Sequence, residues 1–337
     1  MTRSEADALT IAVDAMGGDK APQEIVAGAL DAARELGVGI LLIGREDEVA
    51  PFLPSGGLPD GVELEHAPDI VTMDEEPASA ARTKKESSLV RSATAVREGR
   101  AQAMVGAGNT GATMAAALLR MGRIRGVARP AIAAPIPVPG AEHPQLLIDA
   151  GSTVDCSPEW LVQFATMGRE YARTRLGVAE PTVGLLSNGE EPGKGDELRK
   201  KTFDLLGGVP GFHGNVEGRD LMHGTVDVIV TDGFTGNVAL KTLEGALRAA
   251  VKLVFGVLDS TPEAREAGTV VTPLLLEAAG VLDPDNTGGA VLLGVDGVCV
   301  ISHGSSSARA IVNAARVAAD CVETDVVTRV KEAVRAG

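Results

Sequence analysis

An apolar run leads into a glycine-rich loop near the start of the chain, at Ile11-Ala-Val-Asp14-Ala-Met-Gly17-Gly18-Asp19. The same order of apolar run, glycine-, serine- or asparagine-rich loop and helical pattern recurs at 104–111, 146–152, 183–189, 228–237 and 300–307. In an open parallel sheet, such loops collect at the carboxyl ends of the strands, where backbone N–H groups and helix N-termini bind anions. We therefore expect a small-molecule active site that handles phosphate or carboxylate.

The composition is that of an acidic globular protein. The 337 residues are 45% hydrophobic, enough for a large core in one α/β domain or in two lobes. Aromatic residues make up only 2% and the formal net charge is −15, which disfavours both base stacking and binding to a phosphate backbone. We expect no nucleic-acid partner.

The cysteines and the N-terminus indicate a cytoplasmic protein. Cys156, Cys299 and Cys321 lie far apart without a C-x-x-C spacing, so neither a disulfide framework nor a zinc site is predicted. Residues 1–8 carry charges where a secretory signal needs apolar residues, and no apolar run is long enough to span a bilayer. Any membrane contact is expected to be peripheral.

Apolar runs of four to eight residues alternate with helical patterns along the chain, for example at 9–13, 24–36 and 40–43. This alternation predicts βαβ units and a mostly parallel sheet with helices on both faces. We expect a single α/β catalytic domain over residues 1–337, built as a three-layer α/β/α sandwich.

Residues 239–258 have the pattern of a strongly amphipathic helix, with Leu240, Leu243 and Leu247 on its apolar face. We interpret it as a helix that packs on the sheet or on a second subunit, in preference to a membrane surface. The apolar stretch 269–276 is broken by Pro273, and the sequence leaves a subunit contact and a shallow lipid contact open. We expect the helical segment 239–285 to make one of these contacts.

Two segments match nucleotide-binding motifs only in part. Gly106-x-Gly108-x-x-Gly111 has the spacing of the dinucleotide fingerprint and follows a predicted strand. The acidic residue expected about 20 positions later is missing, which counts against an NAD(P)-dependent decarboxylating dehydrogenase. Such a dehydrogenase is kept as an alternative. Residues 189–196 differ from the Walker loop in spacing and in the residue after Lys194, which argues against nucleoside triphosphate hydrolysis.

Several residues at strand-to-helix junctions are candidates for anion binding. Lys194 lies between two glycines, where either an anion or solvent can meet it. Asn237 stands at the expected start of the amphipathic helix, as an N-cap and as an amide beside the helix N-terminus. His303 and the serines 305–307 have both a structural and a catalytic interpretation. The basic cluster 82–88 could bind phosphate, an acidic partner or only solvent.

No motif for a covalent nucleophile or a metal is present in the sequence. We therefore expect no metal, and a reaction that depends on positioning and on the stabilisation of anions.

Motifs in six separate segments follow one another in a specific order. They are Ile11-Ala-Val-Asp-Ala-Met-Gly-Gly-Asp-Lys-Ala-Pro22, Gly106-Ala-Gly-Asn-Thr-Gly111, Gly122-Arg-Ile-Arg-Gly126, Gly214-Asn-Val-Glu-Gly-Arg-Asp220, Val230-Thr-Asp-Gly-Phe-Thr-Gly-Asn-Val-Ala-Leu-Lys-Thr-Leu-Glu-Gly245 and His303-Gly-Ser-Ser306. In this order they resemble the phosphate acyltransferase PlsX family of phospholipid synthesis. The resemblance covers residues 9–337.

The resemblance implies reversible acyl transfer from acyl-[acyl-carrier protein] to inorganic phosphate. The acyl phosphate would pass to a membrane-bound acylphosphate:glycerol-3-phosphate acyltransferase. It also implies a homodimer, no cofactor, and a Rossmann-like α/β/α fold similar to isocitrate and isopropylmalate dehydrogenases. By the same resemblance Lys194 and Asn237 are catalytic. The substrate-binding residues would be Asp14, Gly17, Gly18, Asp19, Lys84, Lys85, Ser87, Ser88, Asn109, Thr110, Gly111, Gly233, His303, Gly304, Ser305 and Ser306.

The chemistry of such a transfer agrees with the loops. Phosphate can itself attack a thioester carbonyl, so the protein needs to orient phosphate and supply donors for the oxyanion. The chain departs from the family at 273–289, where a lysine-rich helix before Tyr-Gly-Gly is absent, and a basic dock for the carrier protein is not expected there. A non-catalytic protein that binds acyl groups or phosphate is the remaining alternative.

Overall fold

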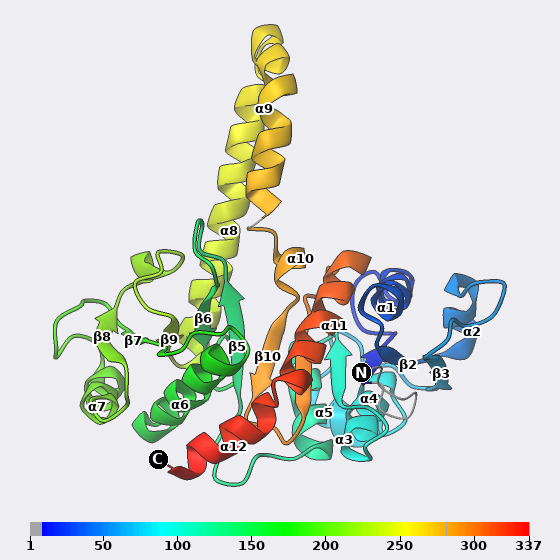
Figure 1. Ribbon diagram of the computed structural model, residues 1–337, viewed down its shortest axis with the longest axis horizontal. Coiled ribbons are helices and arrows are strands. Elements are labelled where there is room, and N and C mark those ends of the chain that lie inside the picture. Colours follow the sequence, from blue (N-terminus) through cyan, green and yellow to red (C-terminus); the bar gives the residue numbers. More distant parts are fainter. Residues whose placement is uncertain (1–8, 281, 337) are drawn as a thin grey trace.

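The computed structural model describes residues 9–280 and 282–336, which form an eleven-stranded sheet between helices (Figure 1). The strands are β1 Thr10–Asp14, β2 Gly39–Gly44, β3 Val62–His66, β4 Ala103–Gly106, β5 Ala131–Ile136, β6 Gln145–Ile148, β7 Val183–Leu186, β8 Phe212–Val216, β9 Val228–Val230, β10 Ala290–Leu293 and β11 Val298–Ile301. The helices are α1 Gln23–Leu36, α2 Glu46–Val49, α3 Pro77–Thr83, α4 Ser88–Arg97, α5 Thr110–Arg120, α6 Pro158–Thr174, α7 Glu197–Leu206, α8 Gly233–Leu258, α9 Pro262–Gly280, α10 Pro284–Thr287, α11 Ala308–Glu323 and α12 Val326–Ala336. Short 3-10 turns lie at Ala50–Phe52 and Gly218–Asp220.

The sheet consists of two parallel blocks joined by antiparallel strands. Its order is β3-β2-β1-β4-β11-β10-β5-β6-β9-β7-β8. The five strands from β3 to β11 are parallel to one another, and so are the four from β6 to β8. Between the blocks, β10 is antiparallel to β11 and β5, and β5 is antiparallel to β6. The predicted mostly parallel sheet is confirmed, but it is not one continuous parallel array.

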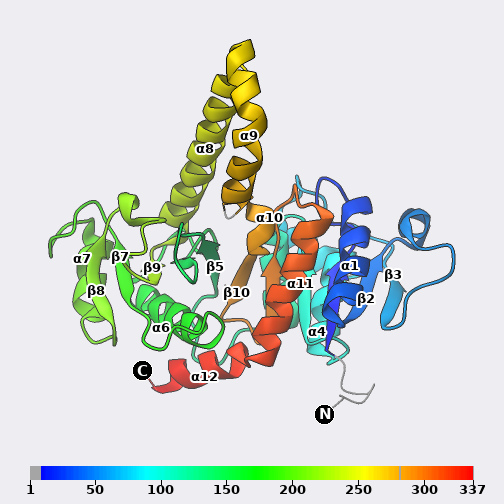
Figure 2. The same cartoon turned by 45° about the horizontal axis from the view of Figure 1, so that its top comes forward.

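Each face of the sheet has its own helix layer and apolar core. Ile11 and Val13 of β1 belong to the apolar cluster that includes residues of α1, α6, α11 and α12, whereas Ala12 belongs to the cluster that includes residues of α3, α4 and α5. Strands covered on both faces are apolar at every position, which explains why the runs in this sequence do not alternate with polar residues. The predicted α/β/α sandwich is confirmed, and Figure 2 shows it from a second direction.

Helices α8 and α9 project from the body as an antiparallel pair (Figures 1 and 2). The helix expected at 239–258 begins earlier, at Gly233, because the Asp232 side chain accepts from the Thr235 N–H and caps it. The expected N-cap role of Asn237 is therefore wrong. Pro273 lies inside α9 and does not end it. Within the described residues, no helix has both the length and the apolar character needed to cross a membrane.

Candidate active site

A pocket of about 720 Å³ lies beside β5 and β10, the strands that join the two blocks, and along α8 from Asn237 to Lys252. Five of the six predicted loops contribute to its lining, through Asp19, Thr110, Ala150, Asn237 and His303. The sixth loop, at 187–189 after β7, is described in full and supplies no lining residue. Loops from both strand blocks therefore meet at one pocket.

Three of these loops pack backbone against backbone below the pocket. A Cβ at Gly17 would lie 2.7 Å from Asp14 Oδ2 and 2.9 Å from the Gly108 nitrogen. Gly18 has a φ of +112°, and a Cβ there would lie 3.1 Å from the carbonyl oxygen of Gly304. The Asp19 N–H donates to that same oxygen at 2.7 Å. These glycines are thus required for the close approach of the loops after β1, β4 and β11.

The loop after β11 presents His303 to the pocket in a defined orientation. The His303 Nδ1 accepts from the Ser305 N–H at 3.2 Å and lies 2.8 Å from the Ser305 hydroxyl. An Nδ1 that accepts leaves the proton of a neutral imidazole on Nε2. Ser306 is buried, and its hydroxyl donates to the His303 carbonyl at 2.6 Å. The loop is therefore closed by its own hydrogen bonds.

Two buried carboxylates shape the strand ends below the pocket. Burial raises the pKa of Asp14, and hydrogen bonds from the Ser88 hydroxyl and the Met16 N–H only partly offset this. Burial also raises the pKa of Asp149, although its carboxylate accepts from the N–H groups of Ile132, Gly151, Ser152 and Thr153. Both groups hold loop backbones in place, and neither lines the pocket.

The first turn of α8 rests on the loop that Asp149 organises. The Gly233 N–H donates to the Thr153 carbonyl at 2.8 Å, and a Cβ at Gly236 would lie 1.9 Å from the Asp149 carbonyl oxygen. Asn237 follows on this turn, is exposed and lines the pocket. The first turn can approach the loop this closely only because Gly233 and Gly236 lack side chains.

Comparison with known proteins shows the family of the chain. The family model described as "Fatty acid synthesis protein" matches residues 9–329. A phosphate acyltransferase of Elusimicrobium minutum is 47% identical over 327 residues, which are 96% of this chain and 95% of the relative. One from a Geobacillus species is 44% identical, over 97% of this chain and 98% of the relative. The chain belongs to the phosphate acyltransferase family. It is an acyltransferase enzyme of fatty acid synthesis.

Solved structures share the fold of this acyltransferase at low sequence identity. A phosphotransacetylase from Streptococcus pyogenes has a TM-score of 0.61 and 15% identity, over 97% of this chain and 94% of that one. A 4-hydroxythreonine-4-phosphate dehydrogenase from Burkholderia phymatum has a TM-score of 0.51 and 13% identity, over 93% of this chain and 98% of that one. The predicted dehydrogenase-like fold is confirmed by this likeness.

The predicted site residues of the acyltransferase fall into two groups. Those that line the pocket are Asp19, Thr110, Asn237, His303, Gly304 and Ser306. Those outside the lining are Asp14, Gly17, Gly18, Lys84, Lys85, Ser87, Ser88, Asn109, Gly111, Lys194, Gly233 and Ser305. Asn109 of the second group supports the first, because its side chain caps α5, which begins at Thr110. Ser87 caps α4, which supplies no lining residue.

The two predicted lysines have different surroundings. Lys84 Nζ donates to the Ile70 carbonyl at 2.7 Å and pairs with Glu75, so its ammonium is used to hold segment 70–75. Lys194 has a half-exposed side chain in the loop between β7 and α7, with Glu191 Oε2 3.9 Å from its Nζ. This pair is wide and solvent-exposed, so it restrains the Lys194 ammonium only weakly.

Sequence reasoning missed the apolar wall of the pocket and one buried arginine. The wall consists of Leu240, Leu243 and Leu247 of α8 with Ile132 and Ile136 of β5. The helical spacing of the leucines was a usable signal, but it could not distinguish a pocket wall from a subunit contact. Arg199 lies two residues inside α7 and is only 8% exposed, and its position in a charged helix gave no sign of burial.

Proposed function

We propose that this enzyme transfers an acyl group from acyl-[acyl-carrier protein] to inorganic phosphate and releases acyl phosphate. The observation that carries the proposal is a single pocket with a polar floor and an apolar wall, which the family's chemistry requires together. The floor contains His303, Ser306 and the loop after β4, and the wall contains the α8 leucines. Phosphate suits the first surface and an acyl chain suits the second.

The proposed reaction is a direct displacement at the thioester carbonyl. An oxygen of phosphate forms a bond to the carbonyl carbon, and the carbonyl π electrons move onto the oxygen. When the tetrahedral intermediate collapses, the carbon–sulfur bond breaks and the phosphopantetheine thiolate leaves, to be protonated by solvent. No protein nucleophile and no cofactor takes part.

Asn237 and Lys194 are the residues that we assign to this step. The Asn237 amide lines the pocket on the first turns of α8, where its N–H can donate to the developing oxyanion. The resemblance to the family brings Lys194 into the proposal, as the cation that neutralises phosphate or the oxyanion. Its weakly held side chain is compatible with this, because ligand binding can replace the Glu191 contact.

The acyl chain is assigned to the wall formed by α8 and β5. Each methylene that leaves water for an apolar wall contributes about 0.8 kcal/mol to binding. Lys241, Arg248 and Lys252 also line the pocket from α8, and we assign these cations to the contact with the acidic carrier protein. This proposed carrier contact differs in place from the segment 273–289, where the sequence lacks a basic helix.

A homodimer formed through α8 and α9 belongs to the same proposal. These helices expose large apolar side chains, among them Leu253 at 71% and Leu274 at 64%. Apolar surface on this scale is typical of a subunit interface, and peripheral membrane contact would use the same helices. Light scattering of the purified protein should give twice the 34.5 kDa chain mass, and a monomer would contradict the dimer.

Kinetics of Asn237→Ala and Lys194→Ala test the residue assignment. We expect kcat for phosphate-dependent thiol release to fall about 100-fold or more in each variant, as for the loss of one oxyanion donor. Lys201→Ala is the matched control, because Lys201 is an exposed lysine of α7 that pairs with Glu197 on its own helix and does not line the pocket. Near-normal kcat in both site variants would refute the assignment.

A further inference from the structure

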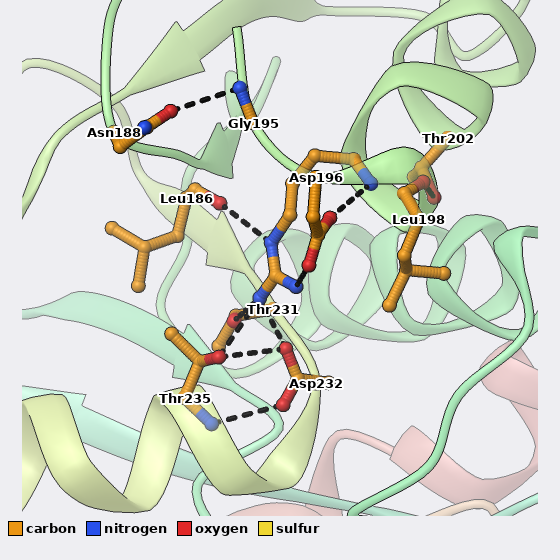
Figure 3. Close-up of polar contacts among 10 residues, drawn as sticks. Leu186, Asn188, Gly195, Asp196, Leu198, Thr202, Thr231, Asp232 and Thr235 are labelled. Atoms are coloured by element: carbon orange, nitrogen blue, oxygen red, sulfur yellow. Dashed lines mark hydrogen bonds and ion pairs between the residues drawn. The ribbon is translucent and has the colours of Figure 1, made fainter.

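Arg199 is a buried arginine that contacts groups from three separate segments, and Figure 3 labels its partners in each of them. Its Nε donates to the Leu186 carbonyl at 3.4 Å, and its Nη1 to Asp196 Oδ2 at 2.9 Å. Its Nη2 donates to the hydroxyls of Thr231 and Thr235, at 3.2 and 2.9 Å, and forms an ion pair with Asp232. Each of the three guanidinium nitrogens thus has a partner.

One side of this cluster leads to Lys194. Asp196 caps α7 by accepting from the Arg199 N–H. The backbone and side chain of Arg199 therefore both contact Asp196, the last residue of the loop between β7 and α7. Gly195 packs directly on the Arg199 side chain, since a Cβ there would lie 2.5 Å from the Arg199 Cβ. The Gly195 N–H also donates to Asn188 Oδ1 at 2.8 Å, which closes the loop. Lys194 is the residue next to Gly195.

The other side of the cluster leads to Asn237. Asp232 caps α8 through the Thr235 N–H, and its second oxygen accepts from the Thr235 hydroxyl. Arg199 therefore holds both the cap and the first turn of the helix on which Asn237 lies. Of the two residues assigned to catalysis, Lys194 lies in a loop and Asn237 on α8, and Arg199 contacts residues close to both.

The sheet itself does not need these contacts. Strands β7 and β9 already pair in parallel, with Gly184 opposite Ile229 and Leu185 opposite Val230. Every partner of Arg199 lies at the last residue of β7 or beyond the strand ends. Arg199 therefore fixes the loops and helix starts relative to each other.

From this geometry we propose that Arg199 is a positioning residue, which sets the distance between the Lys194 loop and the first turn of α8. The proposal rests on the proposed function, because it assumes that Lys194 and Asn237 act in one step. A lysine could keep the charge but not the fork of donors that reaches Leu186, Asp196 and Asp232 together. The structure thus predicts that arginine, and not merely a cation, is required here.

The test compares Arg199→Lys with Arg175→Lys. Arg175 is a partly buried arginine, with a side chain 14% exposed and paired with Asp320 at 3.2 Å, and it does not line the pocket. We expect the two variants to lose a similar amount of Tm. Arg199→Lys should also lower kcat about 10- to 100-fold, as for a small misplacement of reacting groups. Arg175→Lys should leave kcat unchanged. Equal kcat values in the two variants would overturn the proposal.

Hydrogen exchange supplies a readout that does not depend on activity. Arg199→Lys should speed the exchange of backbone amides in both 188–196 and 233–238, whereas Arg175→Lys should affect neither segment. Faster exchange in only one of the two segments would contradict a link between them.

A double-mutant cycle separates this inference from the proposed function. If Arg199 positions Asn237, then Asn237→Ala costs less activity in the Arg199→Lys background than in the wild type. If Lys194→Ala and Asn237→Ala are both fully active, the assignment of these two residues fails and the positioning role fails with it, whereas a wild-type enzyme that releases no thiol with phosphate overturns the proposed function itself. If both are inactive while Arg199→Lys has wild-type kcat, only the positioning role is overturned.

Discussion

The carboxylate of Asp232 is expected to stabilise the protein twice, as the N-cap of α8 and as the buried partner of Arg199. Asp232→Asn keeps a good cap but removes the negative charge. Loss of one partner from a buried ion pair costs about 3–5 kcal/mol of the free energy of unfolding. Asp196 still accepts from Arg199, so we expect the lower end, about 3 kcal/mol. Asp232→Ala also loses the cap, worth about 1 kcal/mol more.

Urea unfolding at pH 7 measures both losses. Asp196→Asn is the matched control, because Asp196 contacts the same guanidinium but has a side chain that is 58% exposed. An exposed pair contributes at most about 1 kcal/mol, so the control should stay close to the wild type. The reasoning is refuted if the free energy of unfolding of Asp232→Asn lies within about 1 kcal/mol of the wild-type value. It is also refuted if Asp196→Asn lowers the free energy of unfolding as much as Asp232→Asn does.

The pH dependence of this contribution has a definite sign. Burial acts to raise the pKa of Asp232, but the hydrogen bonds from Thr235 and the charge of Arg199 outweigh it, so the pKa is lowered from 3.8. A lowered folded pKa means that the stabilisation is present above the unfolded value and is lost as the pH falls through the folded value. The difference in stability between the wild type and Asp232→Asn should therefore narrow as the pH falls below about 4.

Two further predictions concern the helix that carries Asn237 and the thiols. Gly236→Ala would place a Cβ 1.9 Å from the Asp149 carbonyl oxygen, so it should lower both Tm and kcat. Its control is Gly245→Ala, whose Cβ would meet no atom within 4 Å and which should raise Tm slightly and leave kcat unchanged. Equal Tm values for the two variants would contradict the close packing. Burial raises the pKa of Cys156 to about 12, so at pH 8 its alkylation should be slow in the folded protein and fast in urea. A thiol at Cys156 that reacts as fast folded as unfolded would refute this.

The fold was predictable because each strand and loop signal is local. Apolar runs such as 9–13 and their glycine-rich ends mark β1 and its loop without any knowledge of neighbours. The pairing order was not predictable, since nothing in β10 or β5 signals that they join two oppositely directed blocks. The start of α8 was misplaced because Asp232 and Asn237 are both good caps, and only the packing of Gly236 on Asp149 decides between them.

The candidate site was predictable to the extent that it depends on strand ends. Asp19, Thr110, Asn237 and His303 line the pocket as residues of loops that the sequence marks. The role of Lys84 was not visible, because its partner Glu75 lies in a loop with no local pattern. Arg199 was invisible for the same reason, since its carboxylate partner Asp232 lies 33 positions away and follows another strand.

The most direct test of the central claim is the product of the reaction. The protein is incubated with acyl-[acyl-carrier protein] thioester, with and without inorganic phosphate, and free thiol and hydroxylamine-trapped acyl groups are measured. We predict thiol release only when phosphate is present, matched mole for mole by trapped acyl phosphate. Thiol release that does not depend on phosphate, or no release with any acyl chain, would contradict the account.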